Sequence, residues 1–498
     1  MLDDPDRAEP SIGLATAPVP GVVAPGTEAT VRLPRVQLGR PRALPRTRVT
    51  VGPTVGGIAL AVVVLATLAV VAIAAAGPSV LVPRSPETFP NWEAGPLHDI
   101  AVRLITNPDT LGLVFSCVLV VMVVAYLLVV AAARTFSMRT IAIVVVALHL
   151  ILLLSPPPQL TDLFNYLGYA RLGALHHLNP YQHVIKQEIF DPVYRFTSWH
   201  SLRSPYGPLF TALSYPLAFV SLPVAYWTLK IITVALSLGF IALVWHCARR
   251  LGRDPRYVVA FVAFNPIFLI YAVAGFHNDF FMLVPSMAAI ALLLVRRDRS
   301  AGAVLMIAIA IKFTAVLLLP FLLLAVRDRP RQKRFMIGAG VAAIPLAALS
   351  LLLFGFSIPN LQQQSSLLTD FSIPNVVGLL LHVGGGTPIV LKFATVTVVV
   401  VAAYQFFRRR DWLDGAAWTT FALIASLAWL VPWYVIWLLP LVALGSNLAL
   451  RRISIVLTVF LILSFLPVTA NYMADHNVNP LQTPAGQASM NLQSKLAR

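Results

Sequence analysis

The sequence predicts an all-α polytopic membrane protein, and three observations predict that class. Of its 498 residues, 58% are apolar and only 11% are charged, whereas soluble domains carry about 25% charged residues. Apolar runs recur from Val51 to Ala470, and about 20 apolar residues cross a bilayer as a helix. The runs are continuous rather than alternating, which excludes the strands of a β-barrel.

The formal net charge of +17 does not indicate a nucleic-acid partner, because the cations form short clusters between apolar runs. That pattern is typical of cytoplasmic loops, which keep Lys and Arg inside. Residues 1–50 are rich in Pro, Ala and Arg and are predicted to be a disordered cytoplasmic tail. Cys117 and Cys247 form neither a disulfide framework nor a metal-binding spacing.

The basic clusters alternate along residues 51–470 and assign a side of the membrane to each loop. They predict a long external loop at 156–208 and an external C-terminal tail at 471–498. About thirteen membrane segments follow. Eleven of them are Thr54–Ala76, Thr110–Ala133, Thr140–Ser155, Val224–Cys247, Tyr257–Ala274, Phe281–Val295, Phe335–Phe356, Ile389–Phe407, Ala416–Leu430, Trp433–Leu448 and Ile453–Thr469.

The run Ala301–Val326 supplies the other two segments. It is 26 residues long and has basic clusters at both ends, so both ends should lie inside. Two full spans need about 40 residues, which predicts a hairpin of two short helices with Lys312 near its tip. A lone lysine in mid-membrane costs about 2.5–3.5 kcal/mol and should face a polar cavity or an anion. Leu209–Val220 and Pro374–Val383 are too short to cross and are predicted to be surface or re-entrant pieces.

Two outward carboxylates stand out, because Asp162 and Asp279 each lie within a few residues of the external end of a predicted span. Asp99 and Asp370 come next. An interfacial carboxylate is suited to act as a general base towards the hydroxyl of a membrane-bound substrate. The cytoplasmic turns are short and contain no Gly-rich phosphate loop, so any chemistry is expected on the external face.

Five segments then resemble, in order, the motifs of one family. They are TDLFNYLGYARLGALHHLNPY, SPYGPLF, AGFHNDFFML, IKFTAVLLLPFLL and VPWYVIWLLPL. This series is similar to the actinobacterial polyprenol-phosphomannose-dependent α-1,6-mannosyltransferases, which extend the mannan core of lipomannan and lipoarabinomannan. Each segment alone is weak, but five in order are specific. The first motif departs from the family, since it reads Asp-Leu-Phe-Asn-Tyr where Asp-Val-Tyr-Ser-Tyr is usual.

The resemblance implies a GT-C fold, a plasma-membrane location and transfer of mannose from a polyprenyl-phosphate donor to a lipid-anchored mannan acceptor. It implies Asp162 as the base; the alternative is an N-cap of the helix Leu163–Leu175. The remaining residues predicted to bind substrate or phosphate are Tyr166, Arg171, Asn179, Tyr181, Arg203, Tyr206, His277, Asn278, Asp279, Lys312, Trp433 and Tyr434.

Each of these predictions has a plainer alternative. Lys312 is interpreted as the counter-charge of the phosphate, and otherwise as a lysine that snorkels to the interface. His277 and Asp279 bind substrate or else form a polar turn. Trp433 and Tyr434 fit an aromatic belt better than a sugar platform.

Arg171 and Arg203 are interpreted either as phosphate ligands or as solvated charges, and Tyr206 as part of a sugar platform or of a turn. No Asp-x-Asp pair occurs in an outward loop, so no metal or other cofactor is predicted. Transfer of glucose or arabinose from the same class of lipid stays open. A transporter is less favoured, because only Lys312 approaches the midplane and no inverted repeat is evident.

Overall fold

The computed structural model describes residues 51–75, 90–97, 107–158, 162–360, 363, 365–408 and 411–498. The predicted tail at 1–50 and Asp99 lie outside the described residues. Within the described ranges all regular secondary structure is helical, which confirms the all-α prediction. The first half contains α1 (Pro53–Ala75), α2 (Asn91–Ala94), α3 (Pro108–Ala132), η1 (Ala133–Thr135), α4 (Met138–Leu154), α5 (Leu163–Ala174), η2 (Ile185–Glu188), η3 (Tyr194–Phe196), α6 (Pro208–Ser214), η4 (Tyr215–Phe219) and α7 (Leu222–Arg250).

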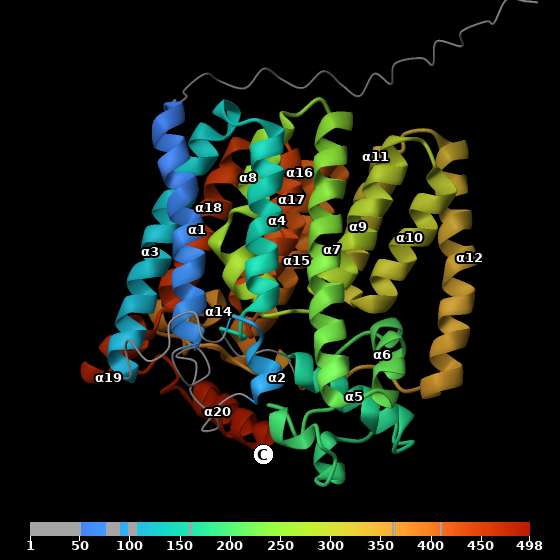
Figure 1. The fold of residues 1–498 in the computed structure, drawn as a ribbon. Helices are drawn as coiled ribbons and strands as arrows, with labels where there is room; N and C mark the ends of the chain where they lie inside the picture. The colour runs from blue at the N-terminus through green and yellow to red at the C-terminus, as the bar shows by residue number, and fades with distance from the viewer. Residues whose placement is uncertain are drawn as a thin grey trace, which may run out of the picture. The chain divides into compact units, whose positions relative to one another are not determined.

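The second half continues this helical array (Figure 1). Its elements are α8 (Pro255–Ala263), η5 (Ile267–Val273), α9 (Asp279–Leu294), α10 (Asp298–Ile311), η6 (Phe313–Leu318), α11 (Leu319–Ala325), α12 (Arg329–Phe354), α14 (Ile373–Leu380), α15 (Pro388–Arg408), α16 (Trp412–Ser426), η7 (Pro432–Trp437), α17 (Leu439–Leu444), α18 (Leu448–Ser464), α19 (Pro467–Asp475) and α20 (Pro484–Ala497).

Five described helices are long and apolar enough to cross a membrane: α1, α3 extended to Thr135, α7, α12 and α15. The number rises to seven if the bent pairs α8–η5 and α18–α19 are each counted as one span. Several shorter apolar helices lie among them. The chain therefore has the character of a membrane-embedded protein.

The predicted membrane segment Tyr257–Ala274 is not one straight helix. The chain bends by 51° between α8 and the π-helical segment η5. Pro266 has no backbone N–H and disfavours helix at the residue before it. The side chain of Asn265 accepts a hydrogen bond from the backbone N–H of Ile267 at 2.9 Å, which begins the new segment. The predicted segment Ile453–Thr469 is likewise broken, by 58° between α18 and α19.

The hairpin prediction is confirmed in its local structure. Helix α10 ends at Ile311, Lys312 has an extended backbone with φ −152° and ψ 116°, and η6 and α11 follow. Lys312 therefore lies at the junction of two short helices. Its side chain therefore does not belong to the surface of either helix.

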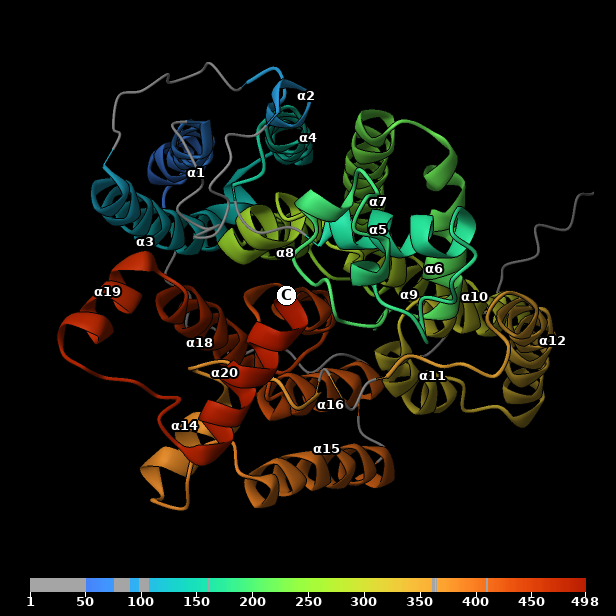
Figure 2. The same ribbon diagram turned by 90° about the horizontal axis from the view of Figure 1, so that it is seen from below.

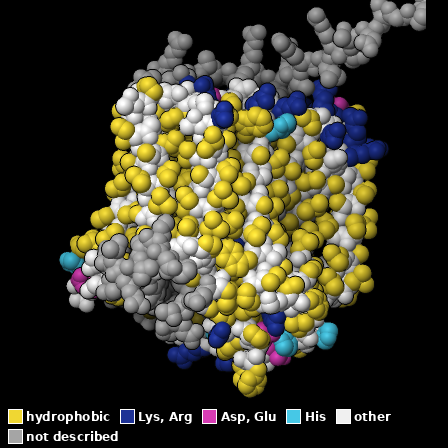
Figure 3. All heavy atoms as spheres, viewed as in Figure 1, with side chains coloured by type: hydrophobic (Ala, Val, Ile, Leu, Met, Phe, Trp, Pro, Cys, Tyr) yellow, Lys and Arg dark blue, Asp and Glu magenta, His cyan; other side chains and the backbone are white. Residues whose placement is uncertain are grey.

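Lys and Arg side chains gather at one end of the helices, and a belt of hydrophobic side chains follows (Figure 3). Helix α7 ends and α12 begins at this basic end, whereas α5, α6 and α20 lie at the opposite end (Figures 1 and 2). The C-terminal helix is bound there, because the backbone N–H of Ser201 donates to the carbonyl of Leu496 at 2.9 Å. The loop that begins with Asp162 and the C-terminus thus share one end of the bundle.

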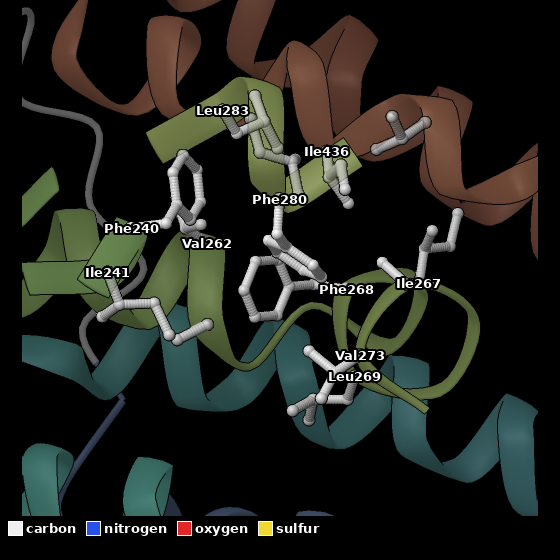
Figure 4. Packing of buried hydrophobic residues seen from close by; sticks show 14 of the residues in the cluster. Phe240, Ile241, Val262, Ile267, Phe268, Leu269, Val273, Phe280, Leu283 and Ile436 are labelled. Carbon is white, nitrogen blue, oxygen red and sulfur yellow. The ribbon is translucent and has the colours of Figure 1, made fainter. Parts of the chain in front are cut away.

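A buried aromatic core supports the start of α9 (Figure 4). The rings of Phe268 and Phe280 meet edge to face at 5.5 Å, and Phe240 stacks on Phe268 at 6.2 Å. All three side chains are buried. Because Phe280 directly follows Asp279, this packing fixes the backbone from which the Asp279 carboxylate projects.

Candidate functional site

Asp162 occupies the residue before α5 but does not cap that helix. Its backbone has φ −76° and ψ −2°, and its side chain accepts no capping hydrogen bond from the first turn of α5. A capping side chain would satisfy an N–H at the helix start. The carboxylate instead accepts a hydrogen bond from the side chain of Tyr206, and 24% of its side chain is exposed.

A turn between η5 and α9 brings His277 and Asn278 to Asp162. The His277 Nδ1 lies 3.8 Å from the nearer Asp162 oxygen, and the His277 ring stacks on Trp433 with centroids 3.8 Å apart. The backbone N–H of Asn278 donates to the hydroxyl of Tyr166 at 3.1 Å. These contacts join α5, the turn and η7 into one site.

Asp279 and Lys312 form a buried ion pair beside this turn. The Lys312 Nζ lies 2.7 Å from Oδ1 of Asp279, whose side chain is 1% exposed. The indole N–H of Trp437 donates to the same oxygen at 2.5 Å. The ammonium also lies over the rings of Trp437 and Tyr434, at 4.8 and 5.3 Å. Charge-assisted hydrogen bonds and ring faces together fix the position of this cation.

Burial shifts the pKa values of Asp162 and His277 in opposite directions. Burial raises the pKa of Asp162 to about 6, against the lowering effect of the Lys312 ammonium. Burial lowers the pKa of His277 to about 3, so its imidazole is neutral near pH 7. Both His277 nitrogens are buried and have no hydrogen-bond partner among the described residues. His277 therefore presents a neutral, buried imidazole to the half-buried carboxylate of Asp162.

The segment around Tyr206 closes the site against the hairpin. The N–H of Gly207 donates to the carbonyl of Ile311 at 3.1 Å, and a Cβ at this glycine would collide with the backbone oxygens of Ala310 and Ile311. The ring of Tyr206 meets Tyr166 edge to face at 4.9 Å. Glycine therefore permits the backbone contact that holds this loop to the tip carrying Lys312.

Nine of the predicted site residues come together in this cluster. They are Asp162, Tyr166, Tyr206, His277, Asn278, Asp279, Lys312, Trp433 and Tyr434. Its two carboxylates have different neighbours, because Asp162 lies beside His277 and Asp279 pairs with Lys312. Chemically, the cluster offers a carboxylate that can take a proton and a fixed cation that can stabilise an anion.

Of the other four predicted residues, three lie apart from the cluster and one, Tyr181, supports it from behind. Arg171 pairs with Asp191, with Nε 2.8 Å from Oδ1, and Asn179 donates to the carbonyl of Phe354 at 2.8 Å. Tyr181 lies behind Tyr206 and donates to its carbonyl at 2.9 Å. Arg203 is exposed, and among the described residues it has no hydrogen bond or ion pair with the cluster.

Sequence reasoning missed one member of the site, Trp437. The motif VPWYVIWLLPL contains it, but its pattern favours a membrane-interface aromatic. Its hydrogen bond joins residues 158 positions apart. The tryptophan itself is the signal that could have identified it, because a buried indole N–H usually donates to an acceptor.

A narrow apolar cleft of about 40 Å³ begins at the cluster. Trp437 and Thr314 line it next to Lys312, and Met282 and Leu283 of α9 continue it. Its remaining walls come from α16 and α17. Lys312 does not line the cleft, but its ammonium lies over the ring of Trp437, which is part of the cleft wall.

Comparisons with known proteins agree with this picture. A family model described as alpha-(1->6)-mannopyranosyltransferase, N-terminal domain, matches residues 54–328. The Alpha-(1->6)-mannopyranosyltransferase A of Mycobacterium tuberculosis is 25% identical over 288 residues, which are 52% of this chain and 55% of that protein. The protein with the same name from Corynebacterium glutamicum is 30% identical over 131 residues, 25% of this chain and 26% of that protein.

The match with the mycobacterial protein thus spans about half of that protein's length, and the corynebacterial match about a quarter. No solved structure matches the chain. The family match includes Asp162, the turn at 277–279 and Lys312, and it ends before η7.

Proposed function

The chain belongs to the alpha-(1->6)-mannopyranosyltransferase family, and from that membership we propose that it is a membrane glycosyltransferase. The proposed reaction moves mannose from a polyprenyl-phosphate donor to a hydroxyl of a lipid-anchored mannan, with an α-1,6 linkage, in the synthesis of lipomannan-type glycans. The observation that carries the proposal is that the Asp162 carboxylate lies close enough to the Lys312 ammonium for that charge to lower its pKa, while Asp279 holds the ammonium in place inside the matched segment.

Asp162 acts as the general base in this proposal. The acceptor oxygen bonds to C1 of mannose, its proton passes to the Asp162 carboxylate, and the bond between C1 and the phosphate oxygen breaks. A base is most effective when its pKa lies near the working pH, and the pKa of about 6 meets that requirement. The other carboxylate, Asp279, is engaged by Lys312 and Trp437, which favours a single displacement over a covalent intermediate on the enzyme.

Lys312 stabilises the departing prenyl phosphate. The bond electrons leave with the phosphate oxygen, so negative charge grows there during the reaction. A preorganised donor at such a point is worth about 10²–10³-fold in rate. The ammonium is held by a carboxylate and two ring faces, so it needs little reorganisation when that charge develops.

The apolar cleft beside Lys312 is the proposed entry of the prenyl chain. Its lining of Met282, Leu283 and other apolar side chains matches a hydrocarbon ligand. The Lys312 ammonium, which lies over Trp437 in the cleft wall, would then meet the phosphate at the end of the prenyl chain. This arrangement explains why donor recognition would need no nucleotide-binding domain.

The remaining parts of the proposal concern placement. We place the protein in the plasma membrane with its N-terminus in the cytoplasm, and α5, α6 and α20 on the external side, because Lys and Arg gather at the opposite end. A GT-C arrangement of about thirteen membrane segments is part of the same proposal. No metal or other cofactor is required in it.

Purified protein, polyprenyl-phosphate mannose labelled in the sugar, and a short α-mannoside acceptor provide the test. We expect a labelled glycosidic product, and a loss of about 10²–10⁴-fold in Asp162→Asn. Asp475→Asn is the matched control, because Asp475 is an exposed acid in α19. An Asp162→Asn variant with the turnover of wild type would remove Asp162 from the mechanism.

Donors carrying glucose or arabinose on the same lipid test the alternative sugar. Faster transfer from one of them than from the mannose donor would overturn the mannose assignment but keep the reaction type. Movement of labelled lipid across sealed vesicles without a glycosidic product would favour the transporter alternative.

A further inference from the structure

Lys230 is a buried cation to which the proposed reaction assigns no part. It lies in α7, which begins at Leu222, so it is about 12 Å along the helix from that start. Its side chain is 0% exposed. An ionisable side chain inside a membrane-spanning helix is costly and usually marks a functional site. The surroundings of Lys230 therefore have to explain its presence.

The ammonium of Lys230 is enclosed by one carbonyl and three aromatic rings. Its Nζ donates to the carbonyl of Ser155, at the end of α4, at 2.9 Å. It also lies 4.4 Å from the centre of the Trp227 ring, 4.7 Å from that of Phe276 and 5.3 Å from that of Tyr226. Carbonyl oxygens and ring faces both attract the charged form of lysine. The contacts with Ser155 and Phe276 join α7 to two other segments of the chain.

Phe276 has an unusual backbone conformation. Its φ is 50°, in the left-handed region that is sterically unfavourable for a bulky L-residue. Its ring is 1% exposed, and its backbone N–H donates to the carbonyl of Val273 at 3.1 Å. A residue stays in this region only where its surroundings compensate, and such positions cluster at functional sites. The Lys230 ammonium over the buried ring is such a compensating contact.

Both segments that Lys230 contacts lead into the candidate site. Phe276 directly precedes His277, whose Nδ1 lies 3.8 Å from the nearer Asp162 oxygen. Ser155 is the C-cap residue of α4 and comes seven positions before Asp162. One ammonium thus contacts the turn that carries the imidazole and the helix end that precedes the carboxylate.

We propose that Lys230 is a positioning residue for sugar transfer, because its contact with the Phe276 ring holds the His277 imidazole beside Asp162. The inference rests on the proposed function, since it takes Asp162 as the base. Lys230 is not expected to touch the substrate, because its side chain is fully buried. The alternative is that Lys230 serves only as the counter-charge of Glu93 in α2, a buried acid whose pKa burial raises to about 8 and the Lys230 ammonium lowers.

Mannosyl transfer by Lys230→Met provides the first test, with Lys392→Met as the matched control. Lys392 is an exposed lysine in the membrane-type helix α15. Because a displaced catalytic group costs up to about 10²-fold in rate, Lys230→Met should lower kcat about 10–10²-fold, and the control should not. In a His277→Ala background, Lys230→Met should cost less than about twofold more, because no imidazole remains to be positioned.

A merely structural role of Lys230 predicts a different outcome. The losses from Lys230→Met and His277→Ala would then multiply, and that result, or a wild-type kcat in Lys230→Met, would overturn the proposal. Glu93→Gln should keep most of its kcat, since it leaves the contact between Lys230 and Phe276 in place. A loss equal to that of Lys230→Met would assign Lys230 to Glu93 instead.

Hydrogen exchange measured by mass spectrometry tests the contact without any transfer. In Lys230→Met, the backbone amides of residues 276–279 should exchange faster than in wild type, and those of α10 should not. Unchanged exchange in this turn would refute the positioning role whatever the activity. Absence of transfer by wild type would refute the proposed function alone.

Phe276→Gly takes the place of Lys230→Met in both measurements if the latter does not fold. Glycine suits the left-handed backbone, so a turn held by backbone preference alone would keep its kcat and its exchange rate. The proposal expects a lower kcat and faster exchange, because the ring that Lys230 contacts is gone. A wild-type kcat in Phe276→Gly would overturn it.

Discussion

The acid limb of the pH–rate profile tests the assignment of Asp162. A base acts in its deprotonated form, and burial raises the pKa of Asp162 from 3.8 to about 6. Transfer should therefore be half-maximal near pH 6 and fall to roughly a tenth of its plateau near pH 5. An aspartate with the unperturbed value would retain roughly nine-tenths of its activity at pH 5.

The ratio of rates at pH 7 and pH 5 is thus the quantity to measure. Initial rates should be taken with saturating donor and acceptor in detergent, between about pH 5 and pH 8. Size-exclusion chromatography at each pH corrects for unfolded protein. The Asp162→Asn variant should be slower and should lack the acid limb, since an amide does not titrate in this range.

A rate that stays level from pH 7 to pH 5 would refute the reasoning, because it would mean that no group with a pKa near 6 must be deprotonated. An acid limb that persists in Asp162→Asn would assign the limb to another group. His277 is not a candidate for it, since burial lowers the pKa of His277 to about 3.

Four further predictions follow from the geometry. Lys312→Met should lower kcat about 10²–10³-fold and move the acid limb to higher pH, because the ammonium lowers the pKa of the base; an unmoved limb would contradict the coupling. Gly207→Ala should reduce transfer by displacing the hairpin tip, whereas Gly239→Ala, where a Cβ meets no atom within 4 Å, should not; equal effects would contradict the collision. Arg171→Met should lower the free energy of unfolding by about 2 kcal/mol, because Asp191 is buried but keeps its contacts with His176 and Val193, and thermal melting in detergent measures it; lost transfer at unchanged stability would show that Arg171 acts in the site. Initial rates in EDTA should equal those without it, and a loss restored by a divalent cation would show that a metal is required.

The sequence predicted the elements whose signals are local. Basic clusters on both sides of Ala301–Val326 were enough to predict two short helices with Lys312 between them, because the charge pattern and the run length together leave few alternatives. The hydropathy pattern does not predict the bend at Pro266, although proline is a local signal. Hydropathy averages over a window, and most residues around Pro266 are apolar, so the run predicts one membrane segment without showing its bend.

The sequence motifs predict which residues belong to the site. They do not predict which of these residues contact one another. The motifs containing Asp162, His277 and Lys312 lie more than 30 positions apart, and only the fold shows that they meet. Arg171 illustrates the opposite case. Its position in the first motif suggested a phosphate ligand, but its partner Asp191 is 20 residues away, in a loop whose path no periodicity reveals.

The Asp279–Lys312 pair raises the question of how a cation that is already neutralised can serve a phosphate. An ammonium has three N–H donors, and Asp279 accepts from it at one oxygen. The other donors remain for a ligand, and 21% of the Lys312 side chain is exposed. Asp279 is then a positioning residue that aims the ammonium, and Trp437 fixes Asp279 in turn. The ion pair does not have to break for the donor to bind, so the cation is already in place when negative charge develops on the leaving phosphate.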